Sequence, residues 1–161
     1  MARKTKRFTV DGTQYEITQL GAVEGIDLFH ELRKLAIPAL RELIQGGLLD
    51  GKVDVEKLDA ASTAKIASLV FGLFESMPKA LERDLRVEFA RNCKVATPSA
   101  AGAMLEMGDA LEANGVFDQH FAGEYGRYQK WLLVGLKFNF AGFLGGSGNS
   151  AGPEKAPTPS P

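Results

Sequence analysis

The sequence predicts a mainly α fold: a single helical domain with an N-terminal β-hairpin and a disordered C-terminal tail. Three patterns lead to this fold class: a short alternation of apolar and polar residues near the start, helical spacing of apolar residues over most of the chain, and an ending rich in Gly, Ser and Pro. The 161 residues are enough for one hydrophobic core. We expect a flexible basic N-terminus at residues 1–6, the domain at residues 7–144 and the tail at residues 145–161.

The hairpin is predicted from the segment RFTVDGTQYEI, residues 7–17. Apolar and polar residues alternate on both sides of Asp11-Gly12, a dipeptide that favours the two-residue type I′ turn. A lone hairpin is marginally stable, so this one must pack against the rest of the domain. Its apolar positions are Phe8, Val10, Tyr15 and Ile17.

Helical spacing of apolar residues begins at about Ala22. Pro38 kinks this first helix or starts a new turn, and Gly46-Gly47 end the pattern. The expected buried stripe before the proline consists of Val23, Ile26, Phe29, Leu32 and Leu35.

Two more helices are expected in the middle of the chain. The first is capped by Asp54 or Asp59, and Pro78 takes the first position of the second, which ends at about Arg91. Residues 95–116 carry no clear pattern, because small residues and glycines weaken any helix there. The apolar faces of the two helices are formed by Ile66, Leu69, Val70, Leu73, Phe74 and Met77, and by Leu81, Leu85 and Phe89.

The charge balance argues against nucleic-acid and membrane partners. The net charge is −1 and the pI ≈ 6.1, so the protein has no strong field to attract a polyanion. We interpret the basic start MARKTKR as a solvated terminus rather than a nucleic-acid-binding arm. The longest apolar run, residues 131–144, is shorter than the roughly 20 residues that cross a bilayer.

Candidate catalytic and metal-binding residues are few. Asp27 and His30 lie one helical turn apart, but Phe117 stands where a second acidic residue would be needed before His120, so a di-iron site is not indicated. We expect His30 on a helix surface, pairing with Asp27 or Glu31. The single cysteine, Cys93, excludes an intramolecular disulfide, indicates a reducing compartment and is expected to pack in or beside the core. The sequence predicts no enzyme, no cofactor and no metal.

The last helix is expected from about Gly123 to Leu144. It lies in the part of the sequence that is richest in aromatic residues. Residues 117–144 contain eight of the fourteen aromatics, and Arg127, Lys130 and Lys137 form the one narrow polar stripe. A helix that is apolar on most sides is either central to a core or buries one face in its own protein and another in a partner. The periodicity favours neither interpretation.

The segment FDQHFAGEYGRYQKWLLVGLKFNFAGFL, residues 117–144, resembles the tail assembly chaperones of tailed bacteriophages and prophages. The likeness is carried by the opening Phe-Asp-x-His-Phe-x-Gly, by the Trp-Leu-Leu that follows and by the closing NFAGF. The N-terminal segments FTVDGTQYEIT and LGAVEGIDLFHELRKLAIPAL are similar too, so the resemblance covers about residues 8–144. Leu144 departs from the aromatic pair expected at the end of the motif.

The resemblance implies a non-catalytic role in the host cytoplasm. Such chaperones keep the long tape measure protein soluble while tail tube protein polymerises around it, and they are absent from the mature virion. The tail tube protein and a second copy of the chain are further candidate partners. The main alternative is a structural or connector protein of the phage tail, and the weaker one is a small helical regulator that binds nucleic acid.

The resemblance also implies which residues bind the tape measure protein. Aromatic side chains of the last helix are expected to divide between anchoring it and contacting the partner. Asp118 is expected to cap this helix, so the FDQHF segment has a purely structural alternative. The partner-binding residues are Phe121, Tyr128, Trp131, Phe138, Phe140 and Phe143, and the structural motif is Phe117, Asp118, His120 and Gly123.

Overall fold

The computed structural model describes residues 2–35, 60–97 and 103–144. The expected features at Pro38, Gly46-Gly47, Asp54 and Asp59, and the expected tail, lie outside the described residues. The strands are β1 (Thr5–Val10), β2 (Thr13–Thr18), β3 (Cys93–Ala96) and β4 (Met104–Glu106), and the helices are α1 (Ala22–Leu35), α3 (Ala60–Ser76), α4 (Lys79–Arg91), α5 (Val116–Phe121) and α6 (Tyr125–Leu144).

The prediction of a mainly α fold with only a hairpin is wrong, because the described residues form a four-stranded antiparallel sheet in the order β1-β2-β3-β4. Ile17 pairs with Cys93, and Val95 pairs with both Tyr15 and Leu105. β3 has four residues and β4 three, too few for the alternation in the sequence to stand out. The hairpin was expected to pack against another part of the domain, and in the structure its second strand, β2, pairs with β3.

The type I′ turn is confirmed. Asp11 and Gly12 have φ values of 47° and 79°, and Val10 pairs with Thr13 across the two-residue turn. Both central residues of a type I′ turn require positive φ, which Gly tolerates fully and Asp better than most residues.

Helix α1 begins at Ala22 as expected, but only part of the expected stripe is buried: Leu32 is buried and Phe29 partly buried, as predicted, whereas Val23 and Ile26 are exposed. Leu28 and Leu32 are buried, whereas Val23 is 71% exposed and Ile26 54% exposed. The contact with α4 selects this phase, and the apolar spacing alone did not reveal it.

The predictions for α3 and α4 hold for the side chains that the structure describes. Leu73 and Met77 of the α3 segment are buried, as are all three predicted core residues of α4, Leu81, Leu85 and Phe89. Pro78 is the N-cap of α4 rather than its first helical residue, and the helix ends at Arg91. The side chains of Ile66, Leu69 and Val70 are outside the described set.

The aromatic segment forms two helices. Gly123, with a φ of 77°, separates α5 from α6, which begins at Tyr125 and ends at Leu144 close to the predicted bounds. The N-cap of α5 is Gly115, and Asp118 lies in the first turn, where its carboxylate accepts a 2.9 Å hydrogen bond from the Asn114 N–H. Asp118 therefore stabilises the start of α5 and does not cap α6.

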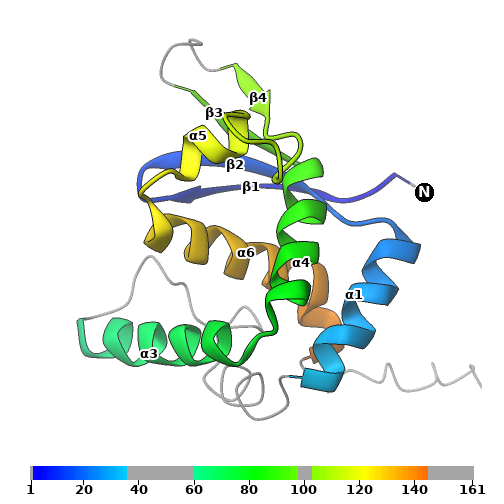
Figure 1. Cartoon of the computed structure of the whole chain (residues 1–161), viewed down its shortest axis with the longest axis vertical. Helices are drawn as coiled ribbons and strands as arrows, with labels where there is room; N and C mark the ends of the chain where they lie inside the picture. Colours follow the sequence, from blue (N-terminus) through cyan, green and yellow to red (C-terminus); the bar gives the residue numbers. More distant parts are fainter. Residues whose placement is uncertain (1, 36–59, 98–102, 145–161) are drawn as a thin grey trace, which may run out of the picture.

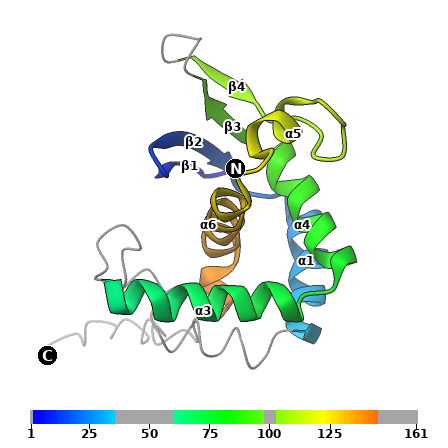
Figure 2. The same cartoon turned by 60° about the vertical axis from the view of Figure 1, so that its left-hand side comes forward.

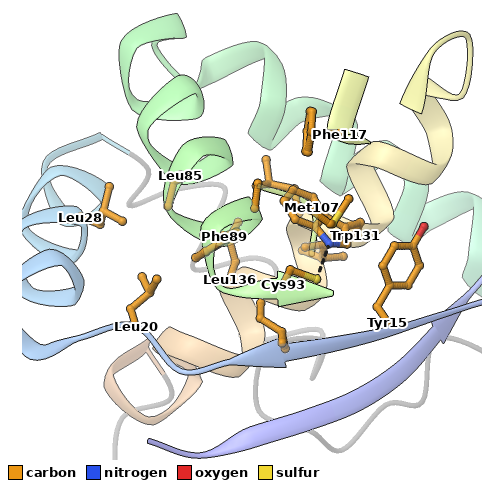
Figure 3. Close-up of a cluster of buried hydrophobic side chains, with 14 of the residues drawn as sticks. Tyr15, Leu20, Leu28, Leu85, Phe89, Cys93, Met107, Phe117, Trp131 and Leu136 are labelled. Atoms are coloured by element: carbon orange, nitrogen blue, oxygen red, sulfur yellow. Dashed lines mark hydrogen bonds between the residues drawn. The ribbon is translucent and has the colours of Figure 1, made fainter. Parts of the chain in front are cut away.

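Helix α6 lies between the sheet and α3 in both views, and α4 and α1 stand side by side at its flank (Figure 1, Figure 2). Its inner residues belong to the same buried cluster as Tyr15 and Ile17 of β2, and Trp131 and Phe140 pack against the ring of Phe89 from α4. The core is assembled around these contacts, so α6 is its central element (Figure 3).

Candidate functional site

Trp131 is the centre of the aromatic cluster and is only 1% exposed. Its ring lies 5.6 Å from that of Phe117, 5.4 Å from that of Phe121 and 6.3 Å from that of Phe89. The indole Nε1–H donates to the Sγ of Cys93 over 3.4 Å (Figure 3). Trp131 of α6 therefore contacts side chains from α4, α5 and β3.

Cys93 is buried, as predicted, and burial raises the pKa of its thiol to about 11. A thiol with such a pKa is almost fully protonated at neutral pH, so it is a poor nucleophile. In this position Cys93 fills the core and accepts the weak hydrogen bond from Trp131.

His120 links α5 to the sheet. Its Nε2 lies 2.6 Å from the hydroxyl of Tyr15, a fully buried residue of β2 that stacks on Phe8. Burial, and then the positive charge of Arg127, lower the pKa of His120 below its usual value, so the imidazole is neutral at pH 7. Burial raises the pKa of Tyr15, which keeps its hydroxyl protonated and able to form this hydrogen bond.

The FDQHF segment makes structural contacts along its length. Phe117 and Phe121 are buried against Trp131, Asp118 bonds the backbone before α5, and His120 bonds Tyr15. These contacts attach α5 to Trp131 of α6 and to Tyr15 of β2.

The six predicted partner-binding residues differ in how far their side chains are buried. Phe121, Trp131 and Phe140 are core residues, and Phe140 is only 2% exposed. Tyr128 and Phe138 are half-buried, and the side chain of Phe143 lies outside the described set. Of the two interpretations of the last helix, its described side chains fit the central one, and tape measure binding through these residues stays a prediction.

A groove between α3, the start of α4 and the start of α6 has accessible aromatic side chains. Its volume is ≈ 360 Å³, and we call it the α3–α6 groove. Tyr125, at the first position of α6, is 75% exposed, and Phe71, one turn before Phe74 on α3, is 56% exposed. The groove is lined by Phe74, Met77, Lys79, Glu82, Tyr125, Tyr128 and Gln129.

Tyr128 forms the inner wall of this groove. Its hydroxyl hydrogen bonds to the carboxylate of Glu82 on α4. Burial raises the pKa of Glu82, and the nearby Arg86 acts in the opposite direction. The contact holds the Tyr128 ring between α4 and α6, with one side against Phe117 and Phe121. The groove therefore has a fixed inner wall and an exposed outer rim.

Sequence reasoning missed Phe71 and Tyr125 as surface residues. Phe71 lies outside the predicted apolar stripe of its helix, and Tyr125 stands between polar and glycine residues in GEYG. The sequence signal for their exposure was that both residues lie outside the apolar stripe of their helix.

The described residues contain no group of three or more His, Cys, Asp or Glu side chains that could hold a metal ion. His30 is exposed on α1, and its neighbour Glu31 pairs with Lys34 instead. Within the described part of the chain, no helix has the length and apolar character needed to cross a membrane.

Comparison with protein families identifies the relatives of this chain. A family model described as "Phage tail assembly chaperone protein, TAC" matches residues 11–150. The chain belongs to the phage tail assembly chaperone family. Comparisons with curated proteins and with solved structures found no match.

The family match confirms the resemblance predicted from the aromatic segment. It spans the chaperone from the hairpin turn to beyond the end of α6, so it includes every residue that lines the α3–α6 groove. A tail assembly chaperone acts by holding other tail components, which makes an accessible apolar surface the feature of interest.

Proposed function

We propose that this chaperone binds the tape measure protein of its phage and assists assembly of the tail tube, without catalysis. The observation that carries the proposal is the family match over residues 11–150. A tape measure protein is long and largely helical, so a protein that keeps it soluble needs an apolar surface that fits a helix. The proposed site of action is the host cytoplasm, before the mature virion forms.

The α3–α6 groove is the surface we assign to this role. Tyr125 is a large exposed side chain in the lining of the groove, Phe71 is exposed one helical turn before the lining residue Phe74, and Met77 adds an adaptable thioether to the lining. Tyr128 is the predicted partner-binding residue that lines this groove, half-buried and held by Glu82. An apolar helix laid into the groove would cover these side chains and remove them from water.

Binding to the tape measure protein tests the proposal. The double variant Phe71→Ser/Tyr125→Ser removes two exposed aromatics without opening the core, so its thermal unfolding should match that of the wild type. We expect affinity for the tape measure protein to fall about thirtyfold, the effect of losing one interface hot spot of about 2 kcal/mol. Titration calorimetry or co-expression followed by a solubility assay measures the loss.

The matched control is Leu105→Ser, because Leu105 is an exposed apolar residue on β4 and does not line the groove. It should leave the affinity unchanged. Equal affinity of the groove variant and the wild type contradicts the assignment of the groove, and no binding by the wild type contradicts the proposed partner.

The alternative, a structural or connector protein of the tail, makes a different prediction for purified particles. A chaperone leaves before the virion matures, whereas a connector stays at a fixed copy number. Quantitative mass spectrometry of purified tails separates the two, and a constant stoichiometric amount in mature tails contradicts the chaperone role.

A further inference from the structure

A polar pocket of ≈ 380 Å³, which we call the Arg127 pocket, is lined by residues of the hairpin turn, β2, the end of β3, α5 and α6. Its lining contains hydroxyl, amide, imidazole and guanidinium groups but no carboxylate. It shares no lining residue with the α3–α6 groove, so a ligand bound here would leave that groove free. The lining residues are Gly12, Thr13, Gln14, Ala96, Thr97, His120 and Arg127.

Arg127 is a mostly covered cation that makes no hydrogen bond to the described residues. Its side chain is 23% exposed, and its Nε atom is buried without a partner among them. The carboxylate that pairs with it, from Glu124, lies 3.9 Å from Nη2, which is longer than a hydrogen bond. Glu124 is 54% exposed, so solvent weakens this pair. The Nη groups of Arg127 therefore have donors to offer to a ligand in the pocket.

His120 contributes a second donor to the same pocket. The hydroxyl of Tyr15 is fully buried and has His120 as its hydrogen-bond partner within the described part of the chain, so the hydroxyl donates to Nε2 over 2.6 Å. A neutral imidazole that accepts at Nε2 carries its proton on Nδ1. This N–H belongs to a half-buried ring in the pocket lining, and no described residue accepts from it.

The charge at the pocket is set by Arg127 and Glu124, because Tyr15 and His120 are neutral at pH 7. The other charged groups of the lining elements have neighbours of opposite charge, have a hydrogen-bond partner or lie far from the pocket. They are Asp11 with Lys130 (2.7 Å), Glu16 with Arg7 (2.7 Å), Lys94 between Glu16 and Glu106 in the sheet, Asp118 with the Asn114 N–H (2.9 Å), and Lys137, about 15 Å further along α6 than Arg127.

We propose that the Arg127 pocket binds a carboxylate group through the guanidinium of Arg127 and the Nδ1–H of His120. A carboxylate carries one negative charge and accepts two parallel hydrogen bonds from a planar guanidinium. Phosphate is a poorer fit, because it carries more than one charge at pH 7 and Glu124 repels the excess. The hydroxyls of Thr13 and Thr97 supply further donors in the lining.

Histidine ring-nitrogen NMR tests the proposal on the full chain, because His30, exposed on α1, is an internal control. At pH 7, a capped Gly-Glu-Gly peptide or sodium acetate should shift the His120 signals to saturation and leave those of His30 unchanged. A Gly-Gln-Gly peptide, or sodium chloride at equal ionic strength, should give no saturable shift. Tighter binding of the Glu peptide than of acetate identifies an acidic side chain of a polypeptide as the source of the carboxylate, and the reverse order identifies a small acid.

Substitutions locate the binding at Arg127. Arg127→Gln should lose about tenfold or more in affinity for the better-bound carboxylate, because it removes the charge-assisted hydrogen bonds. Arg127→Lys keeps the charge without the planar fork and should lose about threefold or more. Arg91→Gln removes an equal charge from α4, outside the pocket, and should bind like the wild type.

Thermal unfolding shows which variants are folded, and Arg127→Lys replaces Arg127→Gln if the latter is not. The absence of a saturable His120 shift in the wild type overturns the proposal, and so does an unchanged affinity in the folded Arg127 variants. An equal loss in Arg91→Gln and Arg127→Gln would mean attraction by overall charge and overturns it too. Tighter binding of inorganic phosphate than of both carboxylate probes overturns the assignment of a carboxylate.

Discussion

Gly135 allows α6 to pass directly beside the Phe89 ring of α4. A Cβ atom at this position would lie 2.5 Å from Cδ2 of Phe89, closer than two carbon atoms can approach. Because Phe89 is itself fully buried, the ring has little room to move. We expect Gly135→Ala to reduce the free energy of unfolding by about 1–3 kcal/mol, the usual cost of overpacking a core. Urea denaturation measures the change.

Gly126, on the same helix, is the matched control. A Cβ there meets no atom within 4 Å, so Gly126→Ala should be neutral or stabilising by roughly 0.5–1 kcal/mol, because alanine loses less backbone entropy in a helix. If the two variants have the same stability, α6 does not pack on Phe89 as described.

His120 gives the fold a pH dependence with a definite sign. Burial lowers the pKa of His120 in the folded protein, while in the unfolded chain it is about 6.5. The unfolded state therefore takes up the proton first, and the associated stability is present above about pH 6.5 and is lost as the pH falls through the lowered folded pKa. A protonated imidazole also cannot accept a hydrogen bond from Tyr15.

The measurement is the difference between the wild type and His120→Gln, because carboxylates add their own pH dependence to both. Urea midpoints should fall more steeply for the wild type than for His120→Gln between about pH 7 and about pH 5. Parallel curves would mean that His120 titrates in the folded protein as it does in the unfolded chain.

Among the elements, a buried amide links α6 to the segment that leads into α1. Asn139 accepts from the Leu20 N–H and donates to the Gly135 carbonyl. Asn139→Ala leaves the Leu20 N–H without its partner, so we expect a loss of about 1–3 kcal/mol in unfolding free energy. Faster hydrogen exchange at Leu20 should accompany the loss. Gln129→Ala, on the same helix, is the control and should leave exchange at Leu20 unchanged.

The elements that the sequence predicted well have local determinants. Asp11-Gly12 determines the hairpin turn by itself, and Pro78 with the spacing of Leu81, Leu85 and Phe89 defines α4. The strands β3 and β4 have no such determinant. They are short, and their place depends on pairing with β2, whose sequence separation from them is large.

The candidate site was predictable only in part for the same reason. The aromatic segment indicated the family and the importance of α6, but not which aromatics are covered. Trp131 packs against Cys93 of β3 and Phe89 of α4, and Phe140 packs against Phe89 and α1, contacts that depend on the tertiary arrangement. Tyr125 and Phe71 are exposed because no described element covers them, and their place outside the apolar stripes of their helices was the only signal of this exposure in the sequence.

At the scale of the whole molecule, α6 is a central support with two accessible surfaces near its ends. The α3–α6 groove includes Tyr125 and Tyr128 near the start of α6, and a second hollow, between the start of α1 and the end of α6, includes Asn139 and Phe140.

Ionic strength should test how the α3–α6 groove binds its partner. The groove is lined mainly by aromatic and thioether side chains with one Lys and one Glu. Raising salt from about 0.05 M to about 0.5 M shortens the Debye length from roughly 14 Å to roughly 4 Å, which screens exposed charges and leaves apolar burial intact. We therefore expect the affinity for the tape measure protein to change less than about threefold between the two salt concentrations. Titrations of the wild type at both concentrations measure the response. A fall in affinity of about tenfold or more would mean that charged contacts, rather than burial of the groove side chains, hold the partner.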